Sequence, residues 1–156
     1  MKIADKEFNL SVEISGKGKI VKREEIIKQN KDFTMMLFMW YGKDFSINAT
    51  VSKVDMNLEE EGVVDYGVAI MLENNKEEVK LLFKTKEENK FLNRYITCFS
   101  AKTMDFLQVY VYFLDKLICF SAELPKDSGI KVKNYARNKY YKMIDKIIKS
   151  IHTFNK

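Results

Sequence analysis

The stretch from Arg94 to Glu123 carries the pattern that most constrains how this chain can fold. Residues 104–114 are rich in aromatic and β-branched side chains, which favour a pleated sheet, and residues 117–122 repeat that pattern. Successive side chains of a strand point to opposite faces, so the alternation separates two faces of a predicted sheet. One face is aliphatic and is formed by Val109, Val111, Phe113, Ile118 and Phe120. We therefore predict three consecutive antiparallel strands whose aliphatic face is turned to a core.

Two short turns, at Lys102-Thr103 and Asp115-Lys116, set the predicted register of this meander. The predicted cross-strand pairs are Tyr95 with Tyr110, Thr97 with Gln108, Phe99 with Phe106, Val109 with Ala122, Val111 with Phe120, Phe113 with Ile118 and Leu114 with Leu117. In this register the same side chains share a face in all three strands, which supports it.

The opposite face of the meander is the candidate binding site, and we call it the aromatic face. It is formed by Tyr95, Thr97, Phe99, Phe106, Gln108, Tyr110 and Tyr112. Tyrosine combines a large apolar contact area with one polar group, which suits an amphipathic or apolar guest. Two alternatives stay open. Either this face is exposed and binds a client, or a second helix from mid-chain covers it.

The first half of the chain predicts further strands. Phe8, Leu10, Val12 and Ile14 alternate with polar residues and indicate a strand over about 6–14. The predicted later strands are an apolar run over 32–41, its antiparallel partner over 45–51, and a strand over 79–83 before a charged loop over 84–90. Residues 21–29 fit either a short helix or an extension of a strand.

Two helices are predicted, one in mid-chain and one at the end. Around 57–75, Asn57 and Glu60 form a candidate capping pair, and apolar residues recur at helical spacing, although a strand over 63–72 is the alternative. A longer helix is predicted from about 131 to 153. Its apolar stripe is formed by Ala136, Tyr140, Ile144, Ile147, Ile148 and Ile151. The aliphatic face of the meander is its expected packing partner.

Together these elements predict one α+β domain over residues 1–156. It consists of a twisted antiparallel β-sheet with a long C-terminal helix packed on one face and a second helix in mid-chain. A chain of 156 residues is long enough to bury a substantial core.

The positive charge is concentrated at the C-terminal end. Residues 131–156 contain eight Lys or Arg against one acid, Asp145, whereas the whole chain has a net charge of +5. The candidates for gripping phosphates are Lys131, Lys133, Arg137, Lys139, Lys142, Lys146 and Lys149. Because no nucleic-acid motif accompanies them, a solvated helix face is favoured and nucleic acid is not the expected partner.

The chain shows no catalytic or metal-binding constellation. It has one histidine, His152, and two cysteines, Cys98 and Cys119, which the predicted register puts on opposite sheet faces. No glycine-rich phosphate loop or nucleophile motif is present. We therefore expect neither an enzyme nor a bound metal or cofactor. The N-terminus has no apolar signal region and no stretch approaches the ~20 apolar residues of a membrane span, which predicts a cytoplasmic protein.

The order of elements over about 63–154 resembles the PsbP/DcrB-like fold. Residues 109–125 resemble the last hairpin of that family and its exit loop, and residues 141–154 resemble its closing helix. The resemblance implies a non-enzymatic binding protein. One branch, the Eag-type chaperones of type VI secretion, is similar in length, and it implies a cytosolic dimer that holds apolar helices of an effector against its sheet. The apolar run over 32–41 and the basic last helix depart from that branch.

The leading functional hypothesis is a cytosolic adaptor or secretion chaperone that shields an apolar segment of a client protein on the aromatic face. The alternative is an immunity protein that neutralises a toxin by direct binding. Nucleic-acid binding through the last helix is a third and weaker hypothesis.

Overall fold

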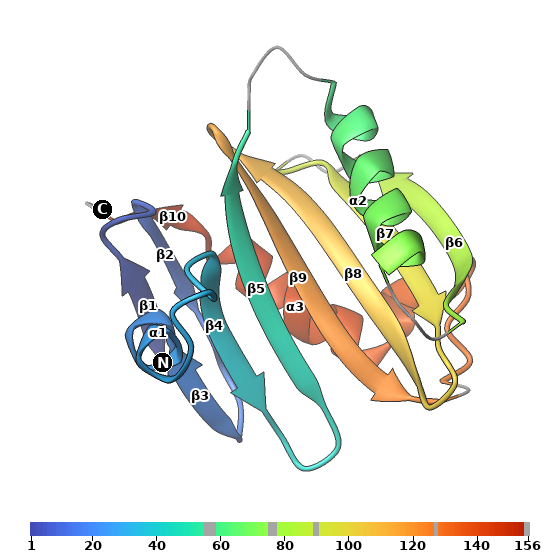
Figure 1. Ribbon diagram of the computed structural model, residues 1–156, viewed down its shortest axis with the longest axis horizontal. Coiled ribbons are helices and arrows are strands. Elements are labelled where there is room, and N and C mark those ends of the chain that lie inside the picture. The colour runs from blue at the N-terminus through green and yellow to red at the C-terminus, as the bar shows by residue number, and fades with distance from the viewer. Residues whose placement is uncertain (55–58, 75–77, 89–90, 127, 155–156) are drawn as a thin grey trace.

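The computed structural model describes residues 1–54, 59–74, 78–88, 91–126 and 128–154 and has an α+β architecture (Figure 1). Seven strands form one antiparallel sheet in the order β3-β4-β5-β9-β8-β7-β6. The strands of this sheet are β3 (Lys19–Lys22), β4 (Met36–Tyr41), β5 (Ser46–Lys53), β6 (Lys80–Glu87), β7 (Arg94–Ser100), β8 (Met104–Phe113) and β9 (Lys116–Pro125). A second, three-stranded sheet contains β1 (Lys2–Asp5), β2 (Leu10–Glu13) and β10 (His152–Thr153).

The predicted meander is present as β7, β8 and β9. Between β7 and β8 the predicted register is confirmed, with Phe99 opposite Phe106 and Tyr95 opposite Tyr110. Between β8 and β9 the predicted register is wrong by two residues, because Val111 lies opposite Ile118 and not opposite Phe120. The turn is centred one residue earlier than predicted, and Leu114 adopts a positive φ of 57° in it. A slip of two residues leaves every side chain on its predicted face.

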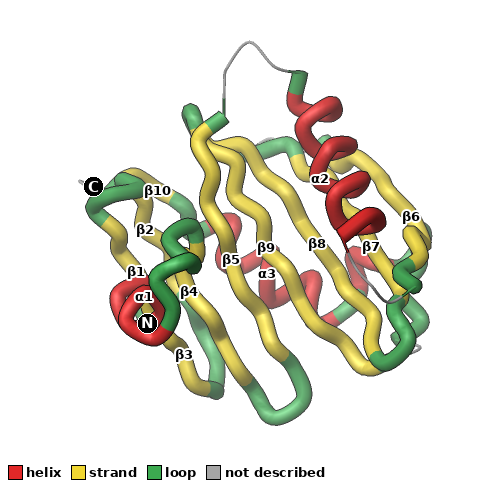
Figure 2. The backbone as a smooth tube through the Cα atoms, viewed as in Figure 1, coloured by secondary structure: helices red, strands yellow, loops and turns green. Residues whose placement is uncertain are grey.

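The two faces of the large sheet carry different helices (Figure 2). Helix α3 (Lys139–Lys149) lies on the aliphatic face, behind the sheet in this view, as the sequence predicts. Its Ile144, Ile147 and Ile148 are buried in one core with Val109 and Phe120. Helix α2 (Glu60–Asn74) lies on the opposite side, in front of β7 and β8. The mid-chain segment is therefore a helix and not the alternative strand; Asn57, the predicted cap, lies outside the described residues.

The C-terminal helix is shorter than predicted at both ends. It begins at Lys139 and not near 131, and it ends at Lys149 and not near 153, where His152–Thr153 form β10. The side chain of Asn138 accepts hydrogen bonds from the backbone N–H of Tyr140 (2.8 Å) and of Tyr141 (3.4 Å) and so caps the helix. Before this cap, only a short 3₁₀ turn forms, η1 (Tyr135–Arg137). The helical spacing of Ala136 continues across this irregular segment, which is why the spacing alone overextended the helix.

Three other boundaries differ from the sequence predictions. The strand predicted over 6–14 is confirmed only for Leu10–Glu13, because residues 6–9 form the turn between β1 and β2. Residues 21–29 are divided between the end of β3 and helix α1 (Arg23–Gln29). Strand β6 runs on to Glu87, so much of the predicted charged loop over 84–90 is in fact a strand. Polar residues at the edge of a sheet resemble a loop in sequence because their outer side faces water.

A polar cluster joins α3 to the sheet at the start of β7. The buried guanidinium of Arg94 contacts the Asp145 carboxylate at 2.5 Å and donates to the Tyr141 hydroxyl at 3.0 Å. Tyr141 in turn donates to Glu87 at 3.1 Å, and Tyr135 donates to Glu87 at 2.6 Å. Burial is costly for a charge unless it is paired, so these contacts fix where α3 lies on the sheet.

Candidate functional site

Helix α2 covers part of the aromatic face. Its Val64 is fully buried and packs with Tyr95 of β7 and Tyr110 of β8. Gly67 lies next to the same tyrosine: a methyl group added there would come within 3.4 Å of the Tyr110 hydroxyl oxygen. The open alternative for this face is therefore resolved for its central part, which the mid-chain helix covers.

Polar contacts hold α2 in this position. The Tyr95 hydroxyl donates to the Glu60 carboxylate at 3.2 Å, and the Tyr112 hydroxyl donates to the Glu60 backbone carbonyl at 3.2 Å. On the other side of the helix, the Lys84 ammonium contacts Asp65 and lies 3.7 Å from Glu61. The helix is thus tied to β6, β7 and β8 by hydrogen bonds and ion pairs in addition to its small apolar contact.

Burial raises the pKa values of the tyrosines on this face above their ordinary value of 10.0. Desolvation, followed by the hydrogen bond to Glu60, raises the pKa of Tyr95 to about 12. Desolvation and the nearby Glu60 charge raise the pKa of Tyr112 to about 12 as well, and burial raises the pKa of Tyr110. At neutral pH all three phenols are therefore hydrogen-bond donors, and Tyr110 donates to the Gln108 side chain at 2.6 Å.

The structure brings all seven predicted site residues together on one face, but it exposes only some of them. The fully or almost fully buried members are Tyr95, Thr97, Phe99 and Tyr110. Phe106, Gln108 and Tyr112 are partly exposed. Buried side chains cannot contact a client while α2 is in place. Their role in client binding remains a prediction, and Tyr110 is the member that also reaches the groove described next.

An open groove of about 640 Å³ lies beside α2, on the side of the end of β5 and the start of β9. Its lining residues are Ser52, Lys53, Val54, Glu59, Gly62, Val63, Tyr66, Gly67, Tyr110 and Leu117. One wall is helical and the other is the sheet, and apolar side chains from both walls face the space between them. This shape and chemistry suit an apolar segment of another protein.

Helix α2 also exposes apolar side chains beside this groove. Tyr66 is 69% exposed and Ile70 is 38% exposed, and with Val63 they are spaced by three and four residues, which places them along one side of the helix. A helix with apolar residues on both its inner and its outer side is normally covered on both. The sequence predicted a helix here from apolar residues at helical spacing but assigned none of them to a site. The sequence feature that could have indicated the site is that the apolar residues of this helix are too many to lie on one face.

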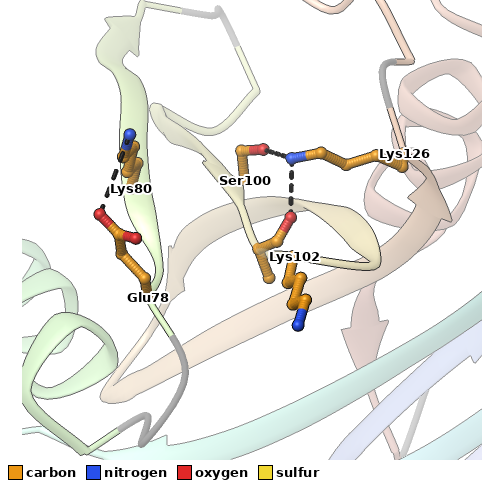
Figure 3. A pocket seen from close by; sticks show the side chains of 6 residues that line it. Glu78, Lys80, Ser100, Lys102 and Lys126 are labelled. Carbon is orange, nitrogen blue, oxygen red and sulfur yellow. Dashed lines mark hydrogen bonds and ion pairs between the residues drawn. The ribbon is translucent and has the colours of Figure 1, made fainter.

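A second groove, of about 620 Å³, lies at the far end of β6 and β7 and is lined by three lysines (Figure 3). The Lys126 ammonium donates to the Ser100 hydroxyl and to the Ala101 carbonyl at 2.7 Å, and Lys80 is 3.9 Å from Glu78. Lys102 points away from both in the close-up. Because the three ammonium groups do not converge, this groove is not built to hold an anion.

The other candidates from the sequence, the basic residues of the last helix, His152 and the two cysteines, are either exposed to solvent or make contacts within the protein. The four exposed residues of α3 are all lysines, of which Lys149 pairs with Asp145 at 2.9 Å and Lys139 lies 3.5 Å from Asp44. His152 contacts the Ser150 carbonyl with its Nδ1 at 2.8 Å. Cys98 and Cys119 are both free, as predicted.

The described residues form neither a metal-binding cluster nor a membrane-spanning helix. Within the described ranges, no cluster of three or more His, Cys, Asp or Glu is placed to hold a metal ion. Likewise, no helix in the described part of the chain is long and apolar enough to span a membrane.

Comparison with known proteins identifies the fold. No protein-family model and no curated protein matches the chain. Among solved structures, the solution structure of cyanobacterial PsbP (CyanoP) from Synechocystis sp. PCC 6803 is 10% identical with a TM-score of 0.65, and the match covers 98% of this chain and 91% of that one. The crystal structure of the Ran-binding protein Mog1p from Saccharomyces cerevisiae is 8% identical with a TM-score of 0.60, covering 99% of this chain and 95% of that one. The chain therefore has the PsbP-like fold expected from its sequence.

Proposed function

We propose that this protein is a non-enzymatic adaptor or chaperone that shields an apolar segment of a client protein in the groove beside α2. The observation that carries the proposal is the outer side of α2, where the exposed Tyr66 lines a groove of about 640 Å³ and the exposed Ile70 lies four residues further along the helix. Exposed apolar side chains next to an apolar groove are typical of protein-binding surfaces. A cytoplasmic setting and a place in a secretion system, as in the Eag-type branch, are part of this proposal.

Two further observations support a binding role. Among the described residues that line the groove, Lys53 and Glu59 carry the charges, and they do not form a cluster of chemistry-bearing side chains. The second structural neighbour is, by its own description, a protein that binds another protein, Ran. Shared fold is a weak guide to function, so the groove and not the neighbour carries the proposal.

The test is a matched pair of surface variants. Tyr66→Asp puts a charge in the groove without touching the core, because Tyr66 is mostly exposed. Tyr41→Asp on β4 is the control, since Tyr41 is 41% exposed and lies outside the lining of the groove. We expect Tyr66→Asp to weaken client capture at least ~30-fold, the loss typical of an interface hot spot, and Tyr41→Asp to leave it unchanged. Equal capture by both variants would remove the groove from consideration.

The alternative is an immunity protein that neutralises a toxin domain, and the lysine-only outer side of α3 favours it. Lys142 and Lys146 lie on that side, and an acidic partner would be steered to it by charge. In that case Lys142→Glu/Lys146→Glu would slow association in a salt-dependent way, while Tyr66→Asp would have no effect. The two functions are therefore separated by which face the partner needs.

A further inference from the structure

The segment that forms the helical wall of the groove has an unusual charge. Residues 59–74 contain five acids and no Lys or Arg, a net charge of −5 in a chain whose total is +5, so the remaining residues sum to +10. The acids are Glu59, Glu60, Glu61, Asp65 and Glu73. The net charge of this segment is therefore opposite in sign to that of the whole protein, so α2 and Glu59 form an acidic surface on a basic protein.

The five acidic side chains differ in whether they make contacts within the protein. Glu60 accepts a hydrogen bond from Tyr95, and Glu61 and Asp65 contact Lys84 on the β6 side of the helix. Glu59 lines the groove and is exposed, and Glu73 is exposed near the other end of the helix. Fourteen residues of helix correspond to a rise of about 21 Å, so these two carboxylates flank the stripe of Val63, Tyr66 and Ile70 at its two ends. Lys53 lies on the opposite wall. The pKa of Asp115 is lowered mainly by the hydrogen bond from Lys116 and least by the charge of Lys53.

Gly62 adds a point of close approach at the groove. It is in the first turn of α2, and nothing lies within 4 Å of where its Cβ would be. Neither backbone nor packing in the described structure therefore requires a glycine here, although glycine costs a helix up to ~1 kcal/mol relative to alanine. A bare backbone on a groove wall allows a second helix to pack closely.

From these three observations we infer that the client segment is an amphipathic helix with Lys or Arg on its polar side. This inference rests on the proposed function and specifies its partner. The apolar side of the client helix packs against Val63, Tyr66 and Leu117 over Gly62, and its cations meet Glu59 and Glu73. A second copy of the chain, or an uncharged apolar helix, would not need these two carboxylates.

The test compares two fluorescein-labelled peptides by anisotropy against the full chain. Both are helix-forming 20-residue peptides with leucine at the same core positions; the remaining positions are lysine in one and glutamate in the other. Because the whole protein is positively charged, general attraction favours the glutamate peptide. We expect the lysine peptide to bind at least ~10-fold more tightly at low salt, with the preference falling as salt rises.

Three variants locate the binding. Gly62→Leu should abolish binding of the lysine peptide by filling the groove, and Glu59→Gln/Glu73→Gln should remove most of its preference. Tyr66→Ala, which removes apolar contact area from the groove without adding a carboxylate, is a second groove variant and should weaken binding of the lysine peptide. Circular dichroism confirms that each variant is folded. If the glutamate peptide binds as tightly in a Gly62→Leu-sensitive way, the inference about charge is overturned while the groove stands. If neither peptide shows binding that Gly62→Leu removes, both the inference and the proposed function fail.

Discussion

The hydroxyl of Tyr95 on β7 donates a hydrogen bond to the carboxylate of Glu60 on α2, 3.2 Å away. This contact joins a residue predicted to bind a client to the first residue of the helix that covers it. Tyr95 and Tyr110 of the aromatic face pack against Val64 of α2, and Tyr110 also lines the groove beside the helix.

Loss of the Tyr95 hydroxyl should loosen α2 without unfolding the sheet. Tyr95→Phe removes the donor to Glu60 and keeps the ring that packs on Val64. We expect a loss of about 1 kcal/mol in the free energy of unfolding. Relative to wild type, amide hydrogen exchange should accelerate more in residues 60–74 than in β8. Tyr66→Phe, on the exposed side of the same helix, is the control and should change neither quantity. Uniform acceleration across the sheet would show that α2 is not held separately.

Replacing Asp145 should destabilise the protein in a pH-dependent way. Desolvation opposes ionisation of Asp145, but the hydrogen bonds from Lys149 and Arg94 hold its pKa below the ordinary value of 3.8. Asp145→Asn leaves the buried Arg94 without its anionic partner, which should cost about 2–3 kcal/mol at pH 7. The control Asp44→Asn breaks an exposed pair with Lys139 and should cost under ~1 kcal/mol.

The sign of the pH dependence follows from the lowered pKa. A carboxyl whose pKa is depressed by folding contributes stability above its unfolded pKa and loses it as pH falls through the folded pKa. The difference in unfolding free energy between wild type and Asp145→Asn should therefore be constant above about pH 5 and shrink as pH falls below 3.8. A difference that grows with acid would contradict the assigned ion pair. Chemical denaturation at a series of pH values measures it.

The cap of α3 should be worth about as much as other asparagine caps. Asn138→Ala removes the acceptor for the backbone N–H of Tyr140 and Tyr141 and should cost about 1 kcal/mol in urea unfolding. Lys142→Ala, at an exposed position of the same helix, should be neutral within ~0.5 kcal/mol. Equal effects of the two changes would argue that the helix begins elsewhere.

Two glycines should respond to alanine with opposite signs. Gly62→Ala meets open space in a helix and should stabilise the fold by up to ~1 kcal/mol. Gly18→Ala should destabilise it by more than that, because Gly18 has a φ of +131° and an added Cβ would lie 2.4 Å from the Tyr41 carbonyl oxygen. Thermal unfolding of both variants checks the pair, and a destabilising Gly62→Ala would mean that the fold itself needs this glycine.

Much of the fold could be predicted from the sequence, because a strong alternation of apolar and polar residues is compatible with few arrangements of strands and faces. The face assignments of Val109 and Tyr110 survive even the two-residue slip between β8 and β9, since the period of a strand is two. The slip itself was not predictable from side-chain pattern, because it depends on Leu114 adopting a positive φ that a branched side chain rarely takes. The start of α3 could not be predicted either, because Asn138 can be identified as the cap only once the residues before it are known not to be helical.

The candidate site was predicted only in part, for a related reason. The composition of the aromatic face was correct, but its accessibility depends on where α2 packs, and that is a tertiary relationship. The apolar residues of α2 lie on two sides, Val64 inward and Tyr66 outward, so no single stripe identified the packed side. The groove is lined by residues of α2 and by Leu117, which are more than fifty positions apart in the sequence. A local sequence pattern cannot predict such a site.

The measurement that tests the central claim most directly is site-specific photo-crosslinking in the cell that makes the protein. A photoreactive amino acid is placed at position 66 or 70 on the outer side of α2, or at position 142 on α3 as the control, since all three side chains are exposed. We predict that positions 66 and 70 capture the same client, that the crosslinked peptide maps to an apolar helix of that client, and that position 142 captures nothing in common with them. Crosslinks confined to position 142 would contradict the account and move the binding face to the lysines of α3.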